Sequence, residues 1–221
     1  MDEVKLEFCK RSDNRYQEIR NRHYIPNNGT HGQQIHFLIH YRGNIVGIIS
    51  GASSVYSVKA RDDFFHIPKD KNLKQKYYLP AIINNTVFRL EYHEKNLATK
   101  VLSKFRLVVA ELWEKLYGIP VIGFETFVIE NDTRKGTSYK ADNWSFIGYT
   151  QGNTKKHTNG LKNTHTRIET DKKMIYCKWA KNKPIVPTIE YKSSWRCETE
   201  YEKQRKKSID KLKKDLVGQV F

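Results

Sequence analysis

Residues 134–150, RKGTSYKADNWSFIGYT, include Tyr139, whose phenol could take part in chemistry. A phenol can donate a proton, stack on a nucleobase, or cover a sheet with its hydroxyl group hydrogen-bonded. The sequence leaves all three roles open for Tyr139. Gly136, three positions earlier, is expected to let the chain turn, which is a structural role.

Three carboxylates are candidates for a general base. Glu91 and Glu125 are predicted near the ends of neighbouring strands, and Asp142 follows Tyr139 closely. Carboxylates beside an apolar core can accept a proton or anchor a metal. The structural alternative for each glutamate is an ion pair with Arg89 or a lysine. A nuclease that uses Glu91, Glu125 and Asp142 is a further alternative function, although the sequence shows no familiar signature of a metal-dependent nuclease.

Several polar and aromatic residues could recognise a base. An asparagine side chain donates to and accepts from the edge of an adenine, and an aromatic ring stacks on it. A turn or bulge role for the Asn84–Asn85 pair is equally open. The expected substrate-binding residues are His23, Tyr24, Asn84, Asn85 and Asn143.

Net charge is the strongest bulk property. The chain has 221 residues, with 40 Lys and Arg against 24 Asp and Glu, which gives +16. Such an excess favours nucleic acid as the partner, because each neutralised phosphate releases condensed counterions. A lysine-rich genome is the alternative explanation. The expected nucleic-acid contacts combine basic and aromatic side chains: Lys155, Lys156, Lys172, Lys173, Trp179, Lys206 and Lys207.

The apolar patterns predict a mixed α/β sheet. Apolar residues recur at three- and four-residue steps through 96–117, with Asn96 and Gly118 as expected caps. Expected helices span 14–24, 96–117, 135–143 and 198–216. Expected strands span 79–90, 119–130, 144–150, 174–180 and a hairpin over 34–53 that turns at 42–44.

The segment HEKNLATKVL resembles the pyrophosphate loop of the GNAT acyltransferase superfamily, in which a basic residue and two small ones precede a Leu-rich helix. The resemblance implies a GNAT-like, mostly antiparallel sheet with a long central helix. It also implies a coenzyme A thioester as the candidate cofactor, although the sequence itself names no donor. Tyr139 occupies the position of the family's tyrosine, which protonates the leaving thiolate. The implied cofactor contacts are His93, Asn96, Leu97, Ala98 and Thr99.

Two narrower resemblances concern GTSYKADNW. This segment is similar to a block of the Mom-type phage proteins, which modify adenine in DNA. Together with RHY, NLATKVLS and ETFV, it is also similar to the DruA domain of the Druantia anti-phage system. Both resemblances imply an action on DNA in phage or mobile-element conflict.

We therefore expect a GNAT-like core over 1–155 and a basic extension over 156–221. The expected function is transfer of a group to a nucleobase, most plausibly at adenine N6. The alternative is a DNA-binding protein without chemistry of its own, because the side chain of Asn96 would crowd a phosphate at a position where the family has glycine. No apolar run is long enough to span a membrane, so a cytoplasmic protein with DNA and protein partners is expected.

Overall fold

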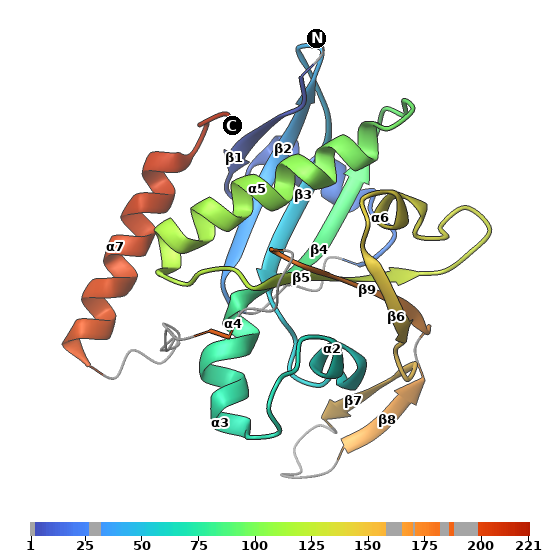
Figure 1. Ribbon diagram of the computed structural model, residues 1–221. Coiled ribbons are helices and arrows are strands. Elements are labelled where there is room, and N and C mark those ends of the chain that lie inside the picture. Colours follow the sequence, from blue (N-terminus) through green and yellow to red (C-terminus); the bar gives the residue numbers. More distant parts are fainter. Residues whose placement is uncertain (1–2, 27–31, 158–164, 170, 182–185, 188–198) are drawn as a thin grey trace.

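The computed structural model describes residues 3–26, 32–157, 165–169, 171–181, 186–187 and 199–221. Its centre is a seven-stranded sheet in the order β1-β2-β3-β4-β5-β9-β6 (Figure 1). Neighbouring strands are antiparallel except for β4 and β5, which are parallel. The strands are β1 (Lys5–Cys9), β2 (Gln34–Tyr41), β3 (Asn44–Ser53), β4 (Ile82–Leu90), β5 (Gly123–Ile129), β6 (Ser145–Tyr149) and β9 (Lys173–Trp179). The predicted mixed, mostly antiparallel α/β fold is confirmed.

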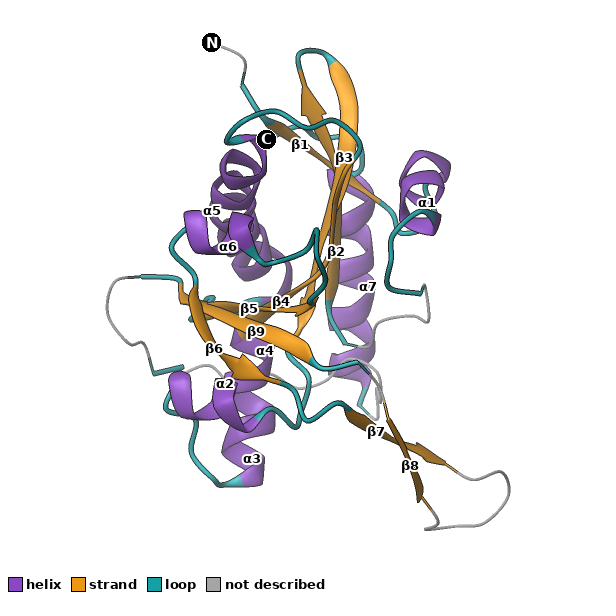
Figure 2. Cartoon of the chain, turned by 90° about the vertical axis from the view of Figure 1, so that its right-hand side faces the viewer, coloured by secondary structure: helices purple, strands orange, loops and turns teal. Residues whose placement is uncertain are grey.

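Helices cover both faces of the sheet. Figure 2 shows β2 and β3 with α5 and α6 on one side and α1 on the other. A separate hairpin pairs β7 (Asn153–His157) with β8 (His165–Glu169). The helices are α1 (Asn14–Asn21), α2 (Lys59–Phe64), α3 (Lys71–Leu73), the π-helix η1 (Lys74–Tyr78), α4 (Leu79–Ala81), α5 (Leu97–Tyr117), α6 (Thr137–Ala141) and α7 (Glu200–Leu216).

The apolar stripe of α5 forms the centre of the core. Val101, Phe105 and Val109 on this helix are completely buried. Burying each such side chain contributes about 2 kcal/mol. The helix ends at Gly118, whose φ of 68° is left-handed and whose amide donates to the Glu114 carbonyl, as the sequence predicted.

Local sequence patterns located the longest helices and most strands of the central sheet but missed several shorter elements. The hairpin turns at Arg42 and Gly43, which both have positive φ. However, α2, α3, η1, β1 and the β7–β8 hairpin lie in segments where the sequence predicted no helix or strand. The predicted strand over 79–90 begins with one helical turn, α4, which contains Pro80.

The strand β9 connects the expected extension to the central sheet. This strand belongs to the expected extension, yet it pairs with β5 over seven residues and with β6 on its other side. The side chains of Met174, Ile175, Tyr176 and Cys177 are buried in the core. A boundary at residue 155 would therefore divide the central sheet.

The last residues of the chain cover the outer edge of β1. Leu6 and Phe221 exchange two backbone hydrogen bonds of 3.0 Å, and the Phe8 amide donates to the Gln219 carbonyl over 2.9 Å. The segment after α7 therefore acts as a short additional strand.

Substitution of Gly136 by alanine should destabilise the fold more than the same change at Gly43. Both glycines have positive φ, 65° and 78°. A Cβ at Gly136 would lie 2.5 Å from Cε2 of Tyr176, whereas nothing lies within 4 Å of a Cβ at Gly43. We expect a loss of about 1 kcal/mol for Gly43→Ala and at least about 2 kcal/mol for Gly136→Ala in urea unfolding. Equal losses would contradict the packing described for Tyr176.

Candidate functional site

The candidate site lies where β4 and β5 separate. These strands pair only between Ile82–Asn84 and Gly123–Glu125. Beyond that point they diverge (Figure 1), so backbone groups that face the gap need other partners. The hydroxyl group of Thr126 meets this need by donating to the Asn85 carbonyl over 3.0 Å.

A β-bulge at Thr86 adds to the irregularity of β4. Ser50 pairs with Val87 and Gly51 pairs with Asn85, so Thr86 has no opposite residue in the register. The side-chain amide of Asn85 donates to the carbonyls of Ser50 and Val87 over 2.9 and 3.0 Å. Asn85 thus has the bulge role that the sequence left open, and both of its amide hydrogens are used.

Tyr139 completes this network from α6. Its hydroxyl group donates to Oδ1 of Asn85 over 2.8 Å and lies 3.4 Å from Oγ1 of Thr126. The ring packs against Trp144 and stacks on Tyr176. Burial raises the pKa of Tyr139, so the phenol is neutral at physiological pH. A neutral phenol can act as an acid, but here its proton already bonds Asn85.

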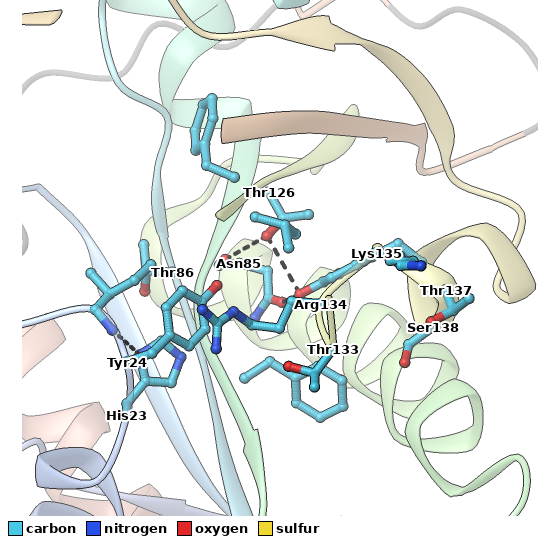
Figure 3. A pocket seen from close by; sticks show the side chains of 16 residues that line it. His23, Tyr24, Asn85, Thr86, Thr126, Thr133, Arg134, Lys135, Thr137 and Ser138 are labelled. Carbon is cyan, nitrogen blue, oxygen red and sulfur yellow. Dashed lines mark hydrogen bonds between the residues drawn. The ribbon is translucent and has the colours of Figure 1, made fainter. Parts of the chain in front are cut away.

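A cleft of about 170 Å³ opens beside Tyr139. Figure 3 shows its walls, with His23 and Tyr24 on one side and Lys135, Thr137 and Ser138 on the other. The described lining residues include two basic side chains and no acidic one. The polar lining residues are Asn85, Thr86, Thr126, Thr133, Arg134, Lys135, Thr137 and Ser138.

The aromatic wall of the cleft is already stacked. The guanidinium carbon of Arg134 lies 4.1 Å from the centre of the Tyr24 ring, and His23 stacks on the same ring at 4.5 Å. Nδ1 of His23 accepts from the Ile25 amide over 3.1 Å. Burial lowers the pKa of His23 to about 4, so this imidazole is neutral and its proton is on Nε2. The wall therefore offers stacking surfaces and one N–H donor.

Asp142 and Asn143 hold α6 in place and do not line the cleft. Asp142 accepts two 2.8 Å hydrogen bonds from Arg106 on α5 and one of 2.7 Å from Nε1 of Trp144. Asn143 has a left-handed φ of 58°, which asparagine tolerates better than most residues. Its carbonyl accepts from the Lys178 ammonium group.

Each of the two candidate glutamates has its own arginine partners. Glu91 pairs with Arg89 and lies 3.4 Å from Arg22 near the surface. Glu125 is completely buried and accepts a 2.9 Å hydrogen bond from Arg61, which is also completely buried. Within the described part of the chain, no group of three or more His, Cys, Asp or Glu side chains could hold a metal ion. The nuclease alternative thus finds no assembled site among these acids.

The amino end of α5 does not fit the pyrophosphate of coenzyme A. Asn96 has φ of 65° and its side chain caps no amide, while the Leu97 amide donates to the Glu94 carbonyl over 3.1 Å. The carboxylate of Glu94 accepts a hydrogen bond from Tyr92 in the same turn and another from Tyr41 at the end of β2. The turn before α5 is thus closed by its own hydrogen bonds, and the Glu94 carboxylate in it is paired with Arg42 over 3.1 Å.

None of the five predicted cofactor contacts lines the cleft beside Tyr139. His93 is exposed, whereas Leu97 is part of the hydrophobic core. Ala98 and Thr99 lie in the first turn of α5. The structure therefore does not join the phenol and the helix terminus into one site.

The predicted nucleic-acid contacts do not form one surface. Lys206 and Lys207 are exposed on α7, which lies at the left of Figure 1, far from α6 at the right. Trp179 packs on Phe64 and Phe65, so its ring is engaged within the protein.

The remaining four lysines lie on two other parts of the chain. Lys172 is exposed, and Lys173 lines a second pocket together with Asn84. Lys155 and Lys156 belong to β7, and their side chains lie outside the described part of the structure.

Comparison with known proteins identifies the family. The profile described as "Druantia protein DruA" matches residues 3–196. The chain belongs to the DruA family. No curated protein matches this DruA-family sequence.

Among the described residues, no helix combines the length and apolar composition needed to cross a membrane.

Solved structures show the fold of this DruA-family chain. NAA60 of Arabidopsis thaliana in complex with acetyl-CoA matches with a TM-score of 0.51 and 14% identity, over 80% of this chain and 98% of that chain. An acetyl transferase of Salmonella typhimurium that modifies the N-terminal serine of ribosomal protein L7/L12 matches with a TM-score of 0.39 and 9% identity, over 67% and 64%. The microcin C7 self-immunity acetyltransferase MccE matches with a TM-score of 0.38 and 14% identity, over 66% and 61%. The DruA-family chain thus has the GNAT-like fold that its motifs predicted.

Sequence reasoning missed four residues of this region. Thr126 and Arg134 line the cleft, Arg61 neutralises Glu125, and Glu94 occupies the turn before α5. Three of them lie close in sequence to residues already singled out: Glu94 is two residues before the predicted N-cap, Thr126 follows Glu125, and Arg134 begins the segment that contains Tyr139. Arg61 reaches Glu125 only through a contact between distant segments.

Replacing Tyr139 by phenylalanine should destabilise the chain. The change leaves Oδ1 of Asn85 buried without its donor, which costs about 1–3 kcal/mol. Tyr149→Phe is the matched control, because its hydroxyl group bonds Glu130 at the surface and its loss should cost less than about 0.5 kcal/mol. Urea unfolding measures both, and equal losses would contradict the network around Asn85.

Arg61→Met should destabilise the chain by about 3–5 kcal/mol, because it leaves the carboxylate of Glu125 buried without its cation. The double substitution Arg61→Met/Glu125→Leu should recover most of this loss. Burial already raises the pKa of Glu125 in the folded chain. Its protonation therefore favours folding as the pH falls, so the loss in Arg61→Met should be smaller at pH 5 than at pH 8. A loss independent of pH would contradict this prediction, because it would show that Glu125 has the same protonation state in the folded forms of both proteins.

Proposed function

We propose that this DruA-family chain recognises nucleic acid in anti-phage defence, and that the cleft beside Tyr139 takes a base extruded from its strand. The family supports the defence setting, and the net charge of +16 supports a polyanionic partner. Extrusion of a base costs a few kcal/mol, which contacts to the phosphates must offset.

The observation that carries this proposal is the composition of the cleft. Arg134, which already lies over the Tyr24 ring, provides a guanidinium plane on which a base can stack. Lys135 and Arg134 can pair with a phosphate, since the described lining contains no carboxylate to compete. The threonine and serine hydroxyl groups can bond to the edge of a base.

The proposal does not include coenzyme A. The turn before α5 presents Glu94, and its residues are separate from the cleft. A binding component without acyl transfer needs other proteins for an effect on phage DNA. We therefore include protein partners in the proposed function.

Arg134→Gln should weaken binding of labelled single-stranded DNA about tenfold, because one charged contact and one stacking surface are lost. Lys69→Gln is the control, since Lys69 is exposed and does not line the cleft. Lys206→Gln/Lys207→Gln tests α7 separately. Fluorescence anisotropy at several salt concentrations measures all three variants. Equal affinities of Arg134→Gln and Lys69→Gln would refute the role of the cleft.

A second candidate function is transfer of a group to a nucleobase, most plausibly at adenine N6. It is favoured by the presence of the Tyr139 phenol on the wall of the cleft. Mass spectrometry of nucleosides from phage-infected cells that express the chain should then reveal a new adduct. The adduct should disappear with Tyr139→Phe and persist with Tyr149→Phe when both variants are folded. Unmodified DNA together with retained DNA binding would leave the binding function alone.

A further inference from the structure

A second pocket of about 230 Å³ is lined in part by Tyr16 and Arg20 of α1. This helix lies on the face of the sheet opposite α5 and α6 (Figure 2). The pocket touches the first cleft at the gap between β4 and β5, where both are lined by Ile25, Asn85, Thr86 and Phe127. Its distinguishing side chains are those of Arg11, Tyr16, Arg20, His36, Asn84 and Lys173.

The pocket concentrates positive charge. Arg11, Arg20 and Lys173 line it, and none of its described lining residues is acidic. Arg20 is 7% exposed, and its guanidinium group donates to the carbonyls of Ile25 and Pro26 over 2.8 and 3.0 Å. Carbonyl oxygens satisfy its hydrogen bonds but do not cancel its charge. An anion bound in the pocket would cancel this charge.

Two observations support this electrostatic description. Burial lowers the pKa of Arg20, and the positive charge of Arg11 lowers it further. Burial also lowers the pKa of His36 to about 3, with a further contribution from Arg11. The imidazole is therefore neutral, and its Nδ1 lies 2.9 Å from Oγ of Ser50, which is 2.7 Å from the Tyr16 hydroxyl group.

Asn84 supplies an independent observation. It is 6% exposed, and its Oδ1 is buried without a hydrogen-bond partner within the described residues. An unpaired buried acceptor costs about 1–3 kcal/mol, so a donor is expected at this position. A ligand that combines negative charge with an N–H or O–H donor would satisfy both Asn84 and the three cations.

We propose that this second pocket binds a phosphate monoester that also carries an amino or hydroxyl donor, as a nucleotide does. The phosphate lies among Arg11, Arg20 and Lys173, and the donor bonds Oδ1 of Asn84. This site goes beyond the proposed function, which concerns the cleft beside Tyr139. The same chemistry is offered by a free nucleotide and by the phosphorylated end of a DNA strand.

Calorimetric titration of the full chain with deoxyadenosine monophosphate tests the site. Lys173→Met should weaken binding about tenfold, because a charged hydrogen bond is lost. Lys172→Met is the matched control: Lys172 is the exposed neighbour, does not line the pocket, and should change the affinity less than about twofold. Deoxyadenosine, which has no phosphate, should bind at least about tenfold more weakly than the monophosphate.

A second variant tests the donor contact independently of Lys173. Asn84→Ala should weaken binding of the monophosphate but leave the affinity for sulfate unchanged, since sulfate has no donor at neutral pH. Binding of the monophosphate that is equal in Lys173→Met and Lys172→Met would overturn the proposal. So would the absence of binding by both the monophosphate and sulfate at millimolar concentration.

Binding of oligonucleotides with and without a 5′ phosphate shows whether the ligand is a free nucleotide or the phosphorylated end of a DNA strand. A strand end as the ligand predicts tighter binding of the phosphorylated oligonucleotide and loss of that advantage in Lys173→Met. A free nucleotide as the ligand predicts equal binding of the two oligonucleotides. If Arg134→Gln abolishes binding of DNA while the monophosphate still binds, the pocket and the cleft are independent sites.

Discussion

The parting of β4 and β5 is the constraint on which the rest of this structure depends. Two parallel strands that pair over only three residues leave backbone polar groups at the centre of a protein, where water cannot satisfy them. The chain answers with side chains: Asn85 bonds two carbonyls across the bulge, and Thr126 bonds the carbonyl of Asn85. Tyr139 then fixes the orientation of Asn85. The gap stays open as a cleft because these bonds replace the missing strand pairing.

The block around Tyr139 can therefore be explained by structure before any chemistry is considered. Gly136 lets the chain pass beside Tyr176, Asp142 ties α6 to Arg106, and Asn143 adopts a left-handed turn. The same residues suggest catalysis in the sequence because they are polar and closely spaced. In the structure they are the means by which a short helix is held over a divided sheet. Any chemistry by the phenol would have to break its bond to Asn85.

Elements fixed by contacts between residues close in the chain could be predicted from the sequence, whereas contacts between residues far apart in the chain could not. The apolar stripe of α5 and the two-residue turn at Arg42 and Gly43 are local patterns, so they were predicted closely. The strand over 173–179 was recognised, but its place between β5 and β6 is fixed by pairing with residues far away in the chain. The partner of Asp142 is 36 positions away. Arg61 lies in a segment where the sequence predicted no helix or strand, although its side chain neutralises Glu125 in the core. The resemblance to GNAT proteins gave the fold correctly, whereas the contacts of Glu94 could be seen only in three dimensions.

The hydrogen-bonding edges of the central sheet are unequal. On one side, residues 218–221 occupy the outer edge of β1, so another strand could join there only after displacing them. On the other side, β6 ends the sheet, and among the described residues only β9 pairs with it. Phe146 and Tyr149 are exposed on this strand. Within the part of the chain that the structure describes, β6 is therefore the edge of the central sheet that could accept an added strand without displacing residues 218–221.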